Sequence, residues 1–120
     1  MNKTSYFLEQ SEIYFKNGFY PDALSRRYYA LLHMMVDFIE KENKHDYDRK
    51  HKDIRNMFVE KLYGDKGHFK GRDIKLMYDA RVNADYKRDL EEQFSEKEYI
   101  DWYNIISKYI SEIQQEFAHH

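Results

Sequence analysis

The sequence contains no cysteine, which excludes disulfide bonds, thiolate metal sites and thiol nucleophiles. One proline and four glycines occur among its 120 residues, so long helices can continue with few breaks. No apolar run is long enough to cross a bilayer, and the longest, 28–36, contains His33. The first residues carry no apolar signal segment either. We therefore expect a soluble, cytoplasmic protein without a membrane-spanning segment.

The chain also lacks an excess of charge of one sign, because 20 Lys and Arg oppose 22 Asp and Glu and leave a formal net charge of −2. This balance excludes a generally basic nucleic-acid-binding protein but is compatible with a local basic groove. What the chain has in abundance is charge of both signs (35%) and aromatic rings, with 12 Tyr and 8 Phe. Because a tyrosine hydroxyl must find water or a partner, these rings predict a core with a hydrogen-bonded margin.

The apolar residues recur at helical spacing, and the proline and the glycines fall between the periodic segments. A chain of this length can build one hydrophobic core but not two. We therefore predict a single all-α domain, 1–120, folded as an up-and-down bundle of about five helices. The predicted helices are 4–16, 21–42, 49–62, 73–90 and about 95–117. Three glycines within 63–71 predict a flexible loop before the fourth helix.

The predicted helix 21–42 has the widest apolar surface. Two adjacent rows follow it at helical spacing, formed by Leu24, Tyr28, Leu31, Met35 and Phe38 and by Ala23, Arg27, Ala30 and Met34. A surface this wide predicts burial against more than one helix, which makes this helix the central one. At the start of the last helix, Ser95 and Glu98 have the spacing of a capping box.

Two ionisable residues, Arg81 and Asp85, share the apolar face of the predicted helix 73–90. Their i,i+4 spacing places the guanidinium beside the carboxylate. One interpretation is a buried structural pair, completed by the hydroxyl of Tyr28 or Tyr29. The other is a binding site in which Arg81 holds a phosphate and Asp85 orients the guanidinium. The sequence leaves both interpretations open.

A second combination of basic residues lies on the predicted helix 21–42, where Arg26 and Arg27 precede His33. In a metal-independent RNA cleavage, an Arg would stabilise the developing phosphorane charge while His33 moved a proton. The alternative is a core histidine that is hydrogen-bonded to a neighbouring tyrosine.

The remaining histidines form no metal motif. The His and Asp residues within 45–51 lack an i,i+4 His pair and match no established ligand spacing. We therefore predict no metal ion and no cofactor, and we expect His51 to start the third helix and to bond within the bundle. The basic stretch 66–72 matches no phosphate-loop pattern, which favours a solvated loop.

Three parts of the sequence together resemble the small bacterial and archaeal HEPN-domain proteins. They are the stretch 23–33 with its Tyr-Tyr-Ala, His51 at a helix start, and the Arg-x-x-Ala-Asp-Tyr of 81–86. The resemblance covers nearly the whole chain. It implies a helical bundle with an antiparallel core, commonly a homodimer. It also implies a place among toxin–antitoxin modules, phage defence, partners of nucleotidyltransferases or RNA-cleaving proteins.

Ribonucleases of the wider HEPN superfamily carry an Arg, a polar residue after it and a His a few residues further on, and two copies meet across a dimer to form the active site. In this chain Tyr86 stands where that His is expected, and we expect its ring to cover the inward face of the helix. The candidate catalytic residues are therefore Arg81, Asp85 and Tyr86. The candidate binding residues are Arg81, Asp85, Arg27, Tyr28, His33 and His51.

The absence of the His favours an interaction domain without efficient catalysis. Such a domain would homodimerise through its central helices and act with a partner protein, a nucleotide or RNA, for example in a toxin–antitoxin or phage-defence module with a nucleotidyltransferase-type partner. One alternative is a metal-independent endoribonuclease of the toxin type. A second alternative is a structural bundle that recruits another protein.

Overall fold

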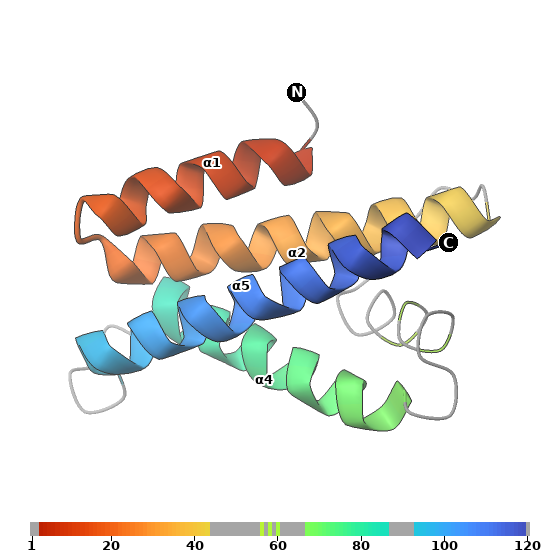
Figure 1. Ribbon diagram of the computed structural model, residues 1–120. Coiled ribbons are helices and arrows are strands. Elements are labelled where there is room, and N and C mark those ends of the chain that lie inside the picture. Colours follow the sequence, from red (N-terminus) through yellow and green to blue (C-terminus); the bar gives the residue numbers. More distant parts are fainter. Residues whose placement is uncertain are drawn as a thin grey trace.

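Four long helices carry most of the residues that the computed structural model describes, which are 3–43, 56, 58, 60, 67–86 and 93–119 (Figure 1). These helices are α1 (Lys3–Lys16), α2 (Tyr20–Asn43), α4 (Gly67–Tyr86) and α5 (Glu96–His119). Residues 56, 58 and 60 are helical as well, and no strand occurs within the described ranges. Side chains are described at 3–37, 56, 58, 60, 72–86 and 93–115. The fold is all-α, as the sequence predicts.

A tight turn joins α1 to α2 and makes them antiparallel neighbours (Figure 1). The Gly18 N–H donates to the Phe15 carbonyl over 3.1 Å, and the Phe19 N–H donates to the Tyr14 carbonyl over 2.9 Å. These two bonds form a Schellman motif, which satisfies carbonyls at the end of a helix. Gly18 has a φ of 80°, in the left-handed region that favours glycine. The turn at Asn17 and Gly18 is therefore where the sequence predicts it.

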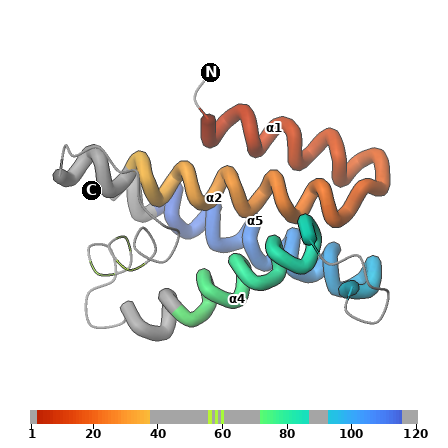
Figure 2. The backbone as a smooth tube through the Cα atoms, turned by 180° about the vertical axis from the view of Figure 1, so that it is seen from behind, coloured from red at the N-terminus to blue at the C-terminus, as the bar shows by residue number. Residues whose placement is uncertain are grey.

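The central helix is α2, as its two apolar rows predict. α1 covers one side of α2, and α4 and α5 pack on the other side (Figure 1 and Figure 2). α4 and α5 also contact each other. The Tyr109 hydroxyl on α5 donates a hydrogen bond to the Asp73 carboxylate on α4. The apolar rows of α2 are thus buried by other helices of the same chain.

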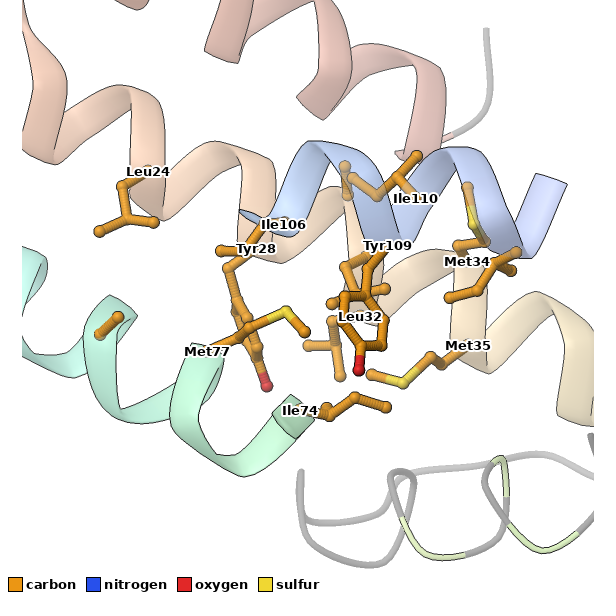
Figure 3. Close-up of a cluster of buried hydrophobic side chains, with 14 of the residues drawn as sticks. Leu24, Tyr28, Leu32, Met34, Met35, Ile74, Met77, Ile106, Tyr109 and Ile110 are labelled. Atoms are coloured by element: carbon orange, nitrogen blue, oxygen red, sulfur yellow. The ribbon is translucent and has the colours of Figure 1, made fainter. Parts of the chain in front are cut away.

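The hydrophobic core lies where α2, α4 and α5 meet (Figure 3). Leu24, Tyr28, Leu31 and Met35 of α2 are fully buried, which confirms the predicted row, while the side chain of Phe38 lies outside the described residues. α4 and α5 contribute Ile74, Met77, Tyr99, Ile106, Tyr109, Ile110 and Ile113. Each large apolar side chain that is removed from water contributes about 1.5–3 kcal/mol.

α4 begins at Gly67, earlier than the predicted residue 73. The predicted loop over 63–71 is therefore wrong for 67–71, which is helical. Glycine disfavours a helix by only about 1 kcal/mol, and tertiary contacts override that preference. Here Asp73 is held by Tyr109 and Ile74 is buried in the core, so the adjoining turn of α4 is anchored.

Two other predicted segments lie largely outside the described residues. One is the predicted helix 49–62, of which only 56, 58 and 60 are described, and Phe58 among them is helical and fully buried. The other is 87–90, the predicted end of the fourth helix, because the described part of α4 ends at Tyr86.

α5 begins with the predicted capping box. The Ser95 N–H donates to Glu98 Oε1 over 3.2 Å, and the Glu98 N–H donates to Ser95 Oγ over 3.2 Å. This exchange satisfies two backbone donors that the first turn of a helix leaves unpaired. The residue before this capping box is tied to α4, because the Phe94 N–H donates to Asn83 Oδ1.

Candidate functional site

The most unusual buried group of the described residues is the guanidinium of Arg81 on α4. Arg81 is only 5% exposed, and its Nη1 donates to Asp85 Oδ2 over 3.2 Å. The pair forms because residues four apart lie on the same face of a helix. A charged side chain is rarely buried unless it is paired, so the contact explains how Arg81 is accommodated.

Four tyrosine rings surround the guanidinium. The distance from Arg81 Cζ to the ring centroid is 5.0 Å for Tyr78, 5.5 Å for Tyr29, 5.7 Å for Tyr28 and 5.7 Å for Tyr86. Tyr28 and Tyr29 come from α2, and Tyr78 and Tyr86 come from α4. Such distances allow cation–π attraction, which is strongest where water is excluded.

We call these four tyrosines together with Arg81 and Asp85 the Arg81 site. The structure thereby brings together Arg81, Asp85, Tyr86 and Tyr28, four of the candidate residues that the sequence indicates. The sequence places Tyr78 on the same helical face as Arg81, three residues before it, but does not indicate it as a partner of the guanidinium.

Arg81 keeps its positive charge in these surroundings. Burial lowers the pKa of Arg81, but the hydrogen bond to Asp85, the electrostatic influence of Tyr29, the charge of Asp85 and a hydrogen bond with Tyr86 raise it, and the net pKa lies above its ordinary value. The buried Nε of Arg81 has no hydrogen-bond partner among the described residues. The site therefore holds a permanent cation whose donors are only partly used.

One edge of the Arg81 site is more accessible than the rest. The Asp85 side chain is 24% exposed and Tyr86 is 67% exposed, whereas Arg81 and Tyr28 are buried. Both accessible residues belong to the last described turn of α4. Tyr86 therefore lies at the outer edge of the site, where its ring faces the guanidinium but does not close the inward face as expected.

Asn83, between the two members of the pair, has a structural role that sequence reasoning missed. It is buried, and its Oδ1 accepts the Phe94 N–H over 3.1 Å and the Tyr99 hydroxyl over 2.8 Å. Burial is the largest cause that raises the pKa of Tyr99, which keeps its hydroxyl a donor. The acceptor joins α4 to the entry of α5. No local pattern reveals this, because the donors are distant in sequence.

Arg27 belongs to a different cluster. Its Nη2 donates to the Tyr103 hydroxyl on α5, and its Cζ lies 4.6 Å from the centroid of the same ring. Tyr103 stacks on Phe15 of α1, with centroids 4.2 Å apart. Arg27 therefore helps to join α1, α2 and α5, and its partners among the described residues lie outside the Arg81 site.

His33 faces α1. Its ring stacks on Phe7 with centroids 5.3 Å apart and an interplanar angle of 7°. Burial lowers the pKa of His33, Lys3 lowers it further, and Asp37 partly opposes both. A stack on Phe7 replaces the expected hydrogen bond to a tyrosine, which does not occur among the described residues. Because Arg27 packs on α5 and His33 on α1, the structure does not bring this pair together for catalysis.

His51 and the other His and Asp residues of 45–51 lie outside the described residues. Within the described part of the chain, no three His, Asp or Glu side chains gather in a way that suits a metal ion. In the same part, no helix combines the length and the apolar character that crossing a bilayer demands.

The fold and the site together define an all-α domain in which a buried arginine of α4 contacts tyrosines of the central helix, α2. A model of the HEPN domain family matches residues 1–116, and the chain therefore belongs to that family. Searches of curated proteins and of solved structures gave no significant match. Membership of the family supports a nucleotide- or RNA-associated function in general terms.

Proposed function

We propose that this HEPN domain binds RNA or a nucleotide through the Arg81 site and lacks efficient catalysis. The observation that carries the proposal is the buried, permanently charged guanidinium with a single carboxylate partner and an unpaired Nε. Guanidinium groups bind phosphate oxygens through directed, charge-assisted hydrogen bonds. Among the described residues, Asp85 is the one that forms an ion pair with Arg81, so a phosphate bound at this site would pair with the guanidinium beside Asp85 or in its place.

The accessible edge of the site suits a nucleotide. The Tyr86 ring is two-thirds exposed and stands 5.7 Å from the guanidinium. Exposed aromatic rings stack on nucleobases with little dependence on base identity, and a neighbouring cation adds attraction for the phosphate. The neutral-to-acidic overall charge is consistent with a local site of this kind rather than a long basic surface.

The same residues argue against efficient cleavage of RNA. Proton transfer needs a group that changes charge near neutral pH, and histidine does so best. Among the described residues, the ionisable side chains in contact with the Arg81 guanidinium are four phenols and one carboxylate, and His33 packs elsewhere on Phe7. The competing proposal, a metal-independent endoribonuclease, therefore requires a proton carrier from outside the described residues or from a second copy.

We also propose that the domain acts as a homodimer and with a partner protein, such as a nucleotidyltransferase of a toxin–antitoxin or phage-defence module. Membership of the HEPN family supports association, because HEPN domains often dimerise, and the described surface exposes several large apolar side chains for a partner to cover. They are Tyr6, Ile13, Phe19, Leu76, Tyr86 and Ile105. Sedimentation should give about twice the 14.9 kDa chain mass, and a monomer throughout the micromolar range would refute the dimer.

The binding test compares Arg81→Ala with Arg72→Ala. Arg72 is an exposed arginine of the same helix, so both variants lose one positive charge. With a fluorescein-labelled, single-stranded RNA of mixed sequence, we expect Arg81→Ala to weaken binding about tenfold or more and Arg72→Ala to weaken it much less. Equal losses would show a general charge effect, and circular dichroism of each variant checks the fold.

The catalytic test uses the same two variants with RNA in EDTA. We expect no cleavage by the unmodified protein at high concentration. Cleavage that Arg81→Ala abolishes and Arg72→Ala retains would establish the endoribonuclease instead. A protein that neither binds nor cleaves RNA, and binds no ATP, would leave the structural bundle as the remaining explanation.

A further inference from the structure

We infer that Asp85 is a built-in competitor of the phosphate at Arg81, so that the described structure is the closed state of the site. This inference rests on the proposed function of Arg81 and adds how binding there is regulated. The Asp85 carboxylate occupies the position at the guanidinium that a phosphate oxygen would need, with Oδ2 3.2 Å from Nη1.

Carboxylate and phosphate oxygens are equivalent acceptors for a guanidinium, and both form charge-assisted hydrogen bonds with it. Asp85 is attached four residues along the same helix, so its local concentration at Arg81 is far above that of any free ligand. An external phosphate must therefore compete with a tethered anion. The free energy of breaking the internal pair is subtracted from every binding event at this site.

Asp85 is the more exposed member of the pair that it forms with Arg81. Tyr28, Tyr29 and Tyr78 stand around the guanidinium on the core side, and all three are buried or partly buried. Asp85 is exposed enough to turn toward water, whereas the Arg81 side chain, at 6% exposure, is not. Opening of the site is therefore a movement of Asp85 away from Arg81, and the ligand binds the fraction of molecules in which it has occurred.

A second ion pair on α4 differs from the Arg81–Asp85 pair in its exposure to water. Lys75 and Asp79 have the same i,i+4 spacing, but their side chains are 49% and 51% exposed. Water and salt screen such a pair, and neither partner is withheld from solvent. Asp79→Asn therefore removes one negative charge from α4 without touching Arg81, which makes it the matched control for Asp85→Asn.

The experiment measures binding of the labelled single-stranded RNA to the unmodified chain, Asp85→Asn, Asp79→Asn and Arg81→Ala by fluorescence anisotropy. The amide of Asp85→Asn keeps the shape and one acceptor oxygen but not the charge. We expect Asp85→Asn to bind about three- to tenfold more tightly than the unmodified chain, and Asp79→Asn to change binding by less than about twofold. Equal tightening by both variants, or no tightening by Asp85→Asn, would overturn the inference.

The Arg81→Ala arm separates the inference from the proposed function. If Arg81→Ala binds RNA as the unmodified chain does, the proposed function is wrong. If Arg81→Ala loses binding while Asp85→Asn binds no better, the function stands and the competition by Asp85 is wrong.

A measurement on the unmodified chain covers the case in which Asp85→Asn does not fold. The ¹³C signal of the Asp85 carboxyl group reports directly on its contact with Arg81. We expect this signal to move when the RNA is added, because the carboxylate leaves the guanidinium. A signal that stays in place at saturating RNA, with binding still dependent on Arg81, would overturn the competition.

Discussion

The hydroxyl of Tyr99 donates a 2.8 Å hydrogen bond to Oδ1 of Asn83, and the same oxygen accepts the backbone N–H of Phe94 over 3.1 Å. One amide oxygen thereby connects α4 with the segment that enters α5. Asn83 and Tyr99 are buried, so water cannot readily replace either partner. Asn83 also lies between Arg81 and Asp85 in sequence, so the bond holds the turn that carries the Arg81 site.

Replacement of this acceptor should be costly. We expect Asn83→Ala to lower the free energy of unfolding by about 1–3 kcal/mol, because two donors lose their partner. Urea denaturation followed by circular dichroism measures the loss. The control is Asn104→Ala, which changes an exposed residue of α5 and should cost less than about 0.5 kcal/mol. Equal losses for the two variants would contradict the assigned role of Asn83.

The Arg27–Tyr103 contact gives a second stability prediction. Tyr103→Phe removes the hydroxyl that accepts from Arg27 but keeps the ring that stacks on Phe15. Because the donor is charged and its Nε already has no partner, we expect a loss of about 1–2 kcal/mol in urea denaturation. Tyr6→Phe removes a hydroxyl from a half-exposed ring and should change stability little. A Tyr103→Phe variant as stable as Tyr6→Phe would refute the prediction.

His33 predicts a pH dependence of stability. Burial and then Lys3 lower its pKa in the folded state below the ordinary 6.5, so the unfolded chain binds the proton more readily. The contribution of His33 to the stability of the fold is therefore complete above about pH 6.5, and it is lost as the pH falls through the lower pKa of the folded state.

The measurement is the free energy of unfolding at several values between about pH 7.5 and about pH 5.5, above the range in which most carboxylates titrate. As the pH is lowered, the free energy of unfolding of His33→Gln should fall less steeply than that of the unmodified chain. The difference between the two slopes isolates the effect of His33 from that of the other histidines. A slope that is unchanged in His33→Gln would show that another group is responsible.

The turn between α1 and α2 gives a prediction about the backbone alone. A Cβ at Gly18 would meet no atom within 4 Å, so a substitution there tests only the φ of 80°. We expect Gly18→Ala to lower the free energy of unfolding by about 1 kcal/mol, and Gly18→Asn to lower it less, because Asn tolerates the left-handed region. The melting temperatures of the unmodified protein, Gly18→Asn and Gly18→Ala should decrease in that order. An alanine variant that melts with the unmodified protein would contradict the assignment.

Features that depend on residues close in sequence could be predicted well. The Ser95–Glu98 capping box, the end of α1 at Asn17 and Gly18 and the central position of α2 follow from spacing and residue type, and the structure confirms each. The Arg81–Asp85 contact also follows, because a helix brings i and i+4 together.

Features that depend on tertiary packing could not be predicted in this way. Glycines predict a loop where α4 has already begun, since contacts with α5 outweigh their weak preference against a helix. The partners of Asn83 lie 11 and 16 positions away, and nothing near Asn83 in sequence indicates them. Likewise, the sequence indicates that Arg27 and His33 share a helix but not that they face α5 and α1 respectively.

The short turn at Gly18 has a consequence for how the domain assembles. α1 and α2 meet after only a few intervening residues, so little chain entropy is lost when they pair. α4 and α5 contact α2 across much larger separations in sequence, and contacts between residues far apart in sequence form more slowly. The N-terminal helical hairpin is thus the natural starting point of folding, and the Arg81 site, built from α2 and α4, is completed only when the later helices dock.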